Sequence, residues 1–130
     1  MSRDHPLVRL ETLALIAVGA FAGANLRYAA LGELPDVQAI LLVNVLGSAI
    51  LGFLAYEAQY AGLLDRRANL VFTTGFLSSL TTYSTFAAQV ALAGGPLETV
   101  AVVAGNYGLG IAGVLVGREL ARRISGGDRP

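Results

Sequence analysis

The sequence contains no cysteine and no lysine, and its single histidine is His5. Without cysteine, disulfide bonds and thiolate chemistry are excluded. One histidine near the N-terminus leaves too few ligands and bases for most transition-metal sites and most nucleophile–base pairs. Charged residues make up only 14% of the chain and the formal net charge is zero, so nothing favours a nucleic-acid partner.

Charge is absent from four long stretches of the chain, and the mean hydropathy is +0.63. The stretches are residues 12–26, 37–56, 68–97 and 99–117. A transmembrane helix needs about 20 apolar residues, and the first stretch reaches that length if it continues past Arg27. The sequence therefore predicts one all-α membrane domain over residues 1–130. Its four transmembrane helices are expected at about residues 10–30, 38–60, 69–93 and 97–120.

The distribution of arginine predicts how these helices are oriented. Four spans place both termini on one side of the membrane, and the first apolar segment lacks a signal-peptide cleavage site. That side would carry eight arginines against Arg27 alone on the other, so both termini are expected in the cytoplasm. The eight are Arg3, Arg9, Arg66, Arg67, Arg118, Arg122, Arg123 and Arg129. Residues 125–130 are expected to form a disordered tail.

The third expected span is unusual because it is rich in hydroxyl groups. Eight of the thirteen residues from position 73 to position 85 are Ser or Thr. One interpretation is a packed helix whose hydroxyls bond back to its own carbonyl groups. The other is a helix interrupted at membrane depth, which is tolerated only where the backbone is buried in protein or lines a cavity.

The polar residues of the spans are neutral. No Asp or Glu lies inside the uncharged stretches, so neither an enzyme nor a proton-coupled transporter is predicted. What remains is a set of neutral donors that suits the passage of an anion: Asn44, Tyr83, Ser84, Thr85, Asn106 and Tyr107. For Asn44 the alternatives are a bond to a neighbouring helix or donation to an anion in transit.

Two further features have both a structural and a functional interpretation. Tyr83 and Phe86 share a helix face, where they either pack in the core or turn their partly positive ring edges toward an anion. Arg27 either extends its guanidinium to the membrane interface or attracts anions to a vestibule. Gly19 and Gly23 have the spacing that lets two helix backbones approach closely.

Three segments of the chain form recognisable motifs. GFLSSLTTYSTF at residues 75–86 resembles the GFxGGLTTFSTF signature of the Fluc/CrcB family of fluoride channels. GANLRY at residues 23–28 is similar to its GAxxRY segment, and NVLGS at residues 44–48, followed by LGF at 51–53, to its NxxGS and LGF segments. The order, the spacing and the four-span plan agree over nearly the whole chain.

The resemblance implies an antiparallel dimer with two fluoride pathways at the subunit interface. It assigns Tyr83, Ser84, Thr85, Phe86 and Asn44 to the pathway and Arg27 to the vestibule. Tyr107, one of the neutral donors named above, is a candidate for a further pathway residue. It also implies a structural sodium ion at a break in the third helix. The carbonyl groups of Ser78 and Thr81, from both subunits, would be its ligands.

The chain departs from the family pattern at four positions. Ser78 and Ser79 replace paired glycines, and a serine would be strained if either position required a positive φ angle. Tyr83 replaces a phenylalanine, and Gln89 stands where Glu is frequent.

The function expected from this resemblance is passive fluoride export that lowers fluoride toxicity. The partner is then either a second copy of the chain or a paralogous subunit. One alternative is a structural subunit that completes a channel made by the paralogue. Another is a small four-helix multidrug transporter, which would need an acidic residue at membrane depth, and Glu11 lies only at the end of the first span.

Overall fold

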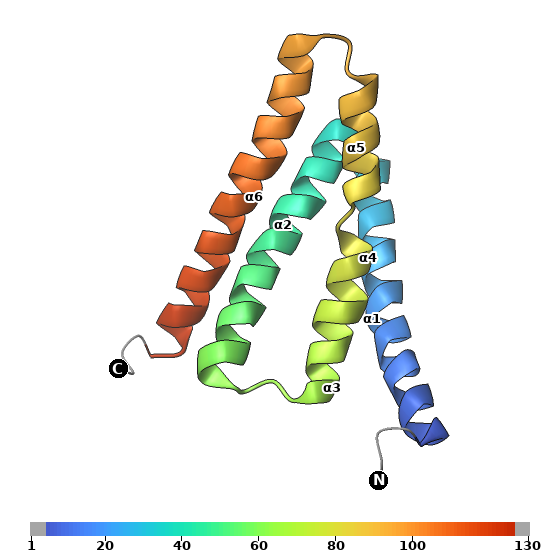
Figure 1. The fold of residues 1–130 in the computed structure, drawn as a ribbon, viewed down its shortest axis with the longest axis vertical. Coiled ribbons are helices and arrows are strands. Elements are labelled where there is room, and N and C mark those ends of the chain that lie inside the picture. Colours follow the sequence, from blue (N-terminus) through green and yellow to red (C-terminus); the bar gives the residue numbers. More distant parts are fainter. Residues whose placement is uncertain (1–4, 127–130) are drawn as a thin grey trace.

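The computed structural model describes residues 5–126, and every regular element in this range is helical (Figure 1). The predicted all-α class is confirmed for this part of the chain. In order, the elements are α1 (Pro6–Glu33), α2 (Asp36–Tyr56), the π-helical turn η1 (Glu57–Ala61), α3 (Arg66–Asn69), the π-helical segment η2 (Leu70–Leu77), α4 (Ser78–Leu80), α5 (Tyr83–Leu92) and α6 (Pro96–Ile124).

Three of these helical stretches are long and apolar enough to cross a membrane, namely α1, α2 continued through η1, and α6. The third expected span, at residues 69–93, for which the family resemblance implies a break, is divided among α3, η2, α4 and α5. Of the tail expected at residues 125–130, Ser125 and Gly126 form a turn, and residues 127–130 lie outside the described range.

Local sequence explains where the long helices begin and end. Pro6 occupies the first turn of α1, where a missing N–H is no loss, and His5 Nδ1 accepts a hydrogen bond from the Leu7 amide at 3.3 Å. The helix ends before Pro35 because a residue preceding proline favours extended backbone, as Leu34 shows with φ −126° and ψ 153°.

The helices pack in two pairs, α1 against η2 and α4, and α2 against α6. Glycine allows both contacts. A methyl group at Gly19 or Gly23 would collide with the backbone of η2, which confirms that this spacing marks a close helix approach. A methyl group at Gly117 would likewise collide with the Ala49 carbonyl of α2.

The two ends of the bundle differ in charge. The start of α1, the connection between η1 and α3, and the end of α6 lie together at one end (Figure 1). This end carries six described arginines, namely Arg9, Arg66, Arg67, Arg118, Arg122 and Arg123. Some are paired, because Arg67 contacts Glu11 and both Arg122 and Arg123 contact Glu119, each at 2.8 Å. Arg3 and Arg129 lie outside the described residues.

Candidate functional site

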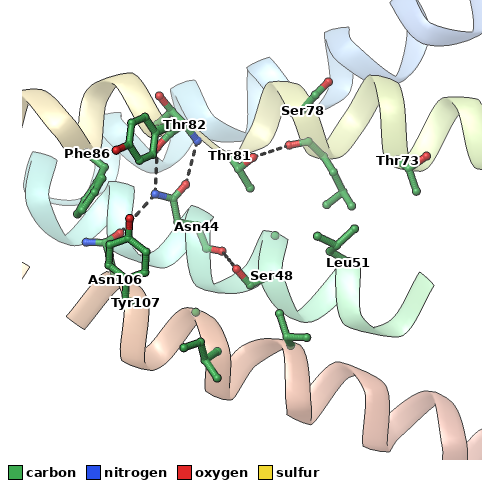
Figure 2. A pocket seen from close by; sticks show the side chains of 16 residues that line it. Asn44, Ser48, Leu51, Thr73, Ser78, Thr81, Thr82, Phe86, Asn106 and Tyr107 are labelled. Carbon is green, nitrogen blue, oxygen red and sulfur yellow. Dashed lines mark hydrogen bonds between the residues drawn. The ribbon is translucent and has the colours of Figure 1, made fainter. Parts of the chain in front are cut away.

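A cavity of about 600 Å³ lies between α2, α6 and the segment from η2 to α5 (Figure 2). None of its lining residues, all within residues 44–114, is charged. They are Asn44, Gly47, Ser48, Leu51, Thr73, Leu77, Ser78, Thr81, Thr82, Tyr83, Phe86, Asn106, Tyr107, Gly110, Ile111 and Val114. The cavity is therefore largely apolar, with a few amide, hydroxyl and aromatic groups gathered on one part of its wall.

Two residues of extended backbone interrupt the helical path beside this cavity. Thr81 has φ −82° and ψ 156°, and Thr82 has φ −148° and ψ 125°. Helix α4 ends just before them and α5 begins just after them. In a continuous helix the Thr82 N–H would donate to the Ser78 carbonyl, so the interruption leaves backbone groups that need other partners.

Asn44 supplies those partners from α2. Its Oδ1 accepts from the Thr82 N–H at 2.9 Å, and its Nδ2 donates to the Thr82 carbonyl at 3.1 Å (Figure 2). The same Nδ2 lies 3.4 Å from Asn106 Oδ1 on α6. The first of the two interpretations, a bond to neighbouring elements, is thus the one this structure displays, and contact with an anion would require one of these bonds to open.

Three aromatic rings continue the wall of the cavity. The Tyr83 and Phe86 ring centroids are 5.7 Å apart, and those of Phe86 and Tyr107 are 5.9 Å apart in an edge-to-face arrangement at 81°. Phe86 is buried, whereas Tyr83 is 73% exposed and Tyr107 56% exposed. Both expected roles of this pair, packing and presentation of ring edges, are compatible with the arrangement.

The hydroxyl groups of the segment divide into two kinds. Those of Thr73, Ser78 and Thr81 donate to carbonyl groups one helical turn earlier, as expected for hydroxyls in a packed helix. Thr82 instead caps α5, since its Oγ1 accepts from the Thr85 amide at 3.3 Å. Ser78 has φ −65°, so serine is not strained at this glycine position of the family.

Some predicted site residues lie away from the cavity. Ser84 and Thr85 are exposed and gather around the Thr82 hydroxyl, at 3.3 and 3.1 Å, rather than lining the cavity. Arg27 of α1 also lies outside the lining, and its guanidinium donates to the Thr81 carbonyl at 3.3 Å. A carbonyl of the interruption therefore faces a positive group in this structure.

Two polar residues near α5 were not predicted in the roles they have. Thr82 was absent from the candidate residues, although a threonine directly before a helical segment is a typical cap. Gln89 Nε2 donates to the Asp36 carbonyl at 3.0 Å, while its Oε1 is buried without a hydrogen-bond partner among the described residues. No local sequence signal indicates the hydrogen bond between Gln89 and Asp36, because the two residues are 53 positions apart.

Comparisons with known proteins agree on one family. A family profile described as "CrcB-like protein, Camphor Resistance (CrcB)" matches residues 14–118. A protein of Haloarcula marismortui named Fluoride-specific ion channel FluC 1 is 51% identical over 129 residues, covering 99% of this chain and 100% of its own length. Fluoride-specific ion channel FluC 2 of Halobacterium salinarum is 46% identical, covering 92% of this chain and 93% of its own. FluC 1 of Natronomonas pharaonis is 44% identical, covering 86% and 95%.

Proposed function

The chain belongs to the CrcB family of fluoride-specific ion channels, and we propose that it is a channel subunit through which fluoride leaves the cell passively. One observation on the present chain supports this function. The cavity beside the helix interruption gathers amide donors and aromatic rings on a wall whose lining residues are all uncharged.

The chemistry of this wall suits a small, strongly hydrated anion. Entering the protein removes water from fluoride, and that loss has to be offset without trapping the ion. Neutral amide and hydroxyl donors and the partly positive ring edges of Phe86 and Tyr107 offset it moderately. Helix α5 also begins at the cavity, and its N-terminal end adds a partial positive charge there.

In this proposal the segment from Arg66 to Leu92 also crosses the membrane. It is the third of four spans in sequence order, and it is broken at Thr81 and Thr82. Support comes from the uncharged stretch of residues 68–97 and from the position of the segment beside α1 and α2 (Figure 1). Carbonyl and N–H groups released within a bilayer need partners, and Asn44 and Arg27 provide them from α2 and α1.

The functional unit is proposed to be an antiparallel dimer. One chain leaves Tyr83 and Tyr107 largely exposed at the cavity, where a second subunit would cover them. The antiparallel arrangement comes from the family resemblance. The partner is either a second copy or a paralogous chain, and the numbers 1 and 2 in the relatives' names favour a paralogue. An auxiliary role beside a conducting paralogue is the second form of the same proposal.

The structural sodium ion of the family is proposed to bind at the carbonyl groups of Ser78 and Thr81. Carbonyl oxygens are hard ligands that suit a hard cation. The Ser78 carbonyl fits this role because the Thr82 N–H, its partner in a continuous helix, donates to Asn44 instead, and at the Thr81 carbonyl the ion would take the place of the Arg27 guanidinium. A bound sodium ion would supply positive charge at the break and join the two subunits.

Replacing sodium with choline at equal ionic strength is expected to lower the unfolding temperature of the purified dimer by roughly 5–10 °C. A ligand present at one hundred times its Kd stabilises the folded state by about 2.7 kcal/mol, which gives a shift of this size. Thermal unfolding in detergent measures the shift. Equal unfolding temperatures in the two salts would refute the sodium site.

The proposed function is tested by fluoride efflux from liposomes that contain the chain alone or together with its paralogue. We expect fluoride-selective efflux, and we expect Phe86→Ile to reduce it at least tenfold because isoleucine has no polarised ring edge. Phe72→Ile is the matched control, since Phe72 is 46% exposed and does not line the cavity. No efflux from either wild-type preparation, or equal losses in both variants, would overturn the proposal.

A further inference from the structure

Asn106 connects α6 to the helix interruption through a second asparagine. Its Nδ2 donates to the Val102 carbonyl, one turn earlier in α6, at 2.9 Å. Its Oδ1 faces Asn44 Nδ2 at 3.4 Å, and Asn44 holds both backbone groups of Thr82. A chain of directed hydrogen bonds therefore runs from the backbone of α6 through two side chains to the interruption between α4 and α5, and Figure 2 shows its part from Asn106 to Thr82.

The bonds through Asn106 and the backbone groups of Thr82 favour the same orientation of the Asn44 amide. The Val102 carbonyl can only accept, so it selects the orientation of Asn106 that turns Nδ2 toward α6 and Oδ1 toward Asn44. That oxygen in turn favours Asn44 Nδ2, which leaves Oδ1 for the Thr82 N–H. The reversed Asn44 amide would place its oxygen against two acceptors and its NH2 group against a donor.

This orientation matters because Asn44 sets the geometry of the break. Thr82 caps α5, whose first turn carries Tyr83 and Phe86. Val102 is buried, and both asparagines are half-buried, so their hydrogen bonds are stronger than in water and costly to leave unmade. Any loosening at Thr82 would shift the two rings against Tyr107, which neighbours Asn106 on α6.

We propose that Asn106 is a positioning residue that orients the Asn44 amide and thereby holds Thr82 and the first turn of α5 in the geometry that passes fluoride. The inference rests on the proposed function for its effect on flux. The contacts that carry it belong to the chain itself and can be measured without transport.

The first test replaces Asn106 with leucine, which has a similar volume but no amide, and with alanine. Leaving the partner groups unsatisfied is expected to lower fluoride efflux roughly ten- to hundredfold. Asn25→Leu is the matched control. Asn25 also donates to the carbonyl one turn earlier, that of Phe21 at 2.7 Å, but lies on the exposed surface of α1 away from the cavity. Its efflux should stay within about twofold of wild type.

A double-mutant cycle then asks whether Asn106 acts through Asn44. If it does, adding Asn106→Ala to Asn44→Ala produces no further loss of efflux, because the residue through which it acts is already absent. The proposal would be overturned if the double variant lost efflux by the product of the two single losses. Normal efflux in both Asn106 variants would overturn it as well.

Hydrogen exchange at the Thr82 amide gives a readout that is independent of transport. In Asn106→Ala the exchange of this N–H should be about tenfold faster and approach that of Asn44→Ala, while dimer assembly and the exchange of α1 stay unchanged. Unchanged exchange at Thr82 would refute the positioning role whatever the flux. If the wild-type protein passed no fluoride, the proposed function would fail and this measurement alone would decide the role of Asn106.

Discussion

Asn44→Asp is expected to lower fluoride efflux about a thousandfold without preventing folding. A fixed negative charge about 4 Å from a passing anion costs roughly 4 kcal/mol at an effective dielectric constant of about 20. Each 1.36 kcal/mol changes a rate about tenfold, so this cost corresponds to roughly three orders of magnitude. All the residues that line the cavity are uncharged, so none of them would offset the charge of the new carboxylate.

The structure adds a second reason for the same loss. Aspartate can still accept from the Thr82 N–H, but its second oxygen would face the Thr82 carbonyl and Asn106 Oδ1, which are both acceptors. The break would therefore lose two hydrogen bonds as well as gaining a charge.

Efflux from liposomes measures the effect, with size-exclusion chromatography to verify assembly. Gln59→Glu is the control, because it makes the same amide-to-carboxylate change on the exposed surface of η1, at the end of the bundle and away from the cavity. An assembled Asn44→Asp protein with wild-type efflux would remove Asn44 from the fluoride pathway.

The features that could be predicted from the sequence depend on local composition and periodicity. Long uncharged stretches predict membrane-crossing helices because burying charge in a bilayer is costly, and α1, α2 with η1, and α6 follow from that alone. Gly19 and Gly23 predict a close helix contact for an equally local reason, since no side chain separates the backbones. The family motifs indicate Asn44, Tyr83 and Phe86 as pathway residues, and in the structure these three residues line one cavity.

The features that could not be predicted depend on contacts between distant residues. The hydroxyl-rich composition does not distinguish Thr81, which bonds back to Leu77, from Thr82, which caps the next helix. The difference arises because Asn44, 38 positions earlier, pairs with the Thr82 backbone. Arg27 likewise reaches a carbonyl 54 positions away, which neither expected role of an interfacial arginine specified.

The second large effect concerns membrane orientation, which is expected to be nearly uniform, with both termini in the cytoplasm. An antiparallel homodimer requires one sequence to insert both ways, and that requires little arginine bias between the two ends. Six described arginines lie at the end of the bundle where α1 begins and α6 ends, and two more precede and follow the described residues in the sequence. Arg27, in the second half of α1, donates to the Thr81 carbonyl at the helix interruption and so is held within the protein.

Acidic partners do not remove this bias. Glu11 and Glu119 pair with arginines at the basic end, but acidic residues contribute little to orientation, so the zero net charge does not imply dual insertion. If the family's antiparallel arrangement holds, a subunit with this bias needs a paralogue inserted the other way. Ser78, Ser79, Tyr83 and Gln89 depart from the family pattern. These departures fit a subunit whose partner keeps the family's own pathway residues.

Reporter tags at the C-terminus, in cells without any paralogue, measure the orientation directly. We expect more than about nine tenths of the chains to have a cytoplasmic C-terminus, and we expect Arg66→Gln with Arg118→Gln to increase the outward fraction. Glu33→Gln with Glu98→Gln is the control, because it changes acidic residues at the opposite end and should leave the orientation unchanged. Equal inward and outward populations of the wild-type chain, together with fluoride efflux from the chain alone, would instead establish a dual-topology homodimer.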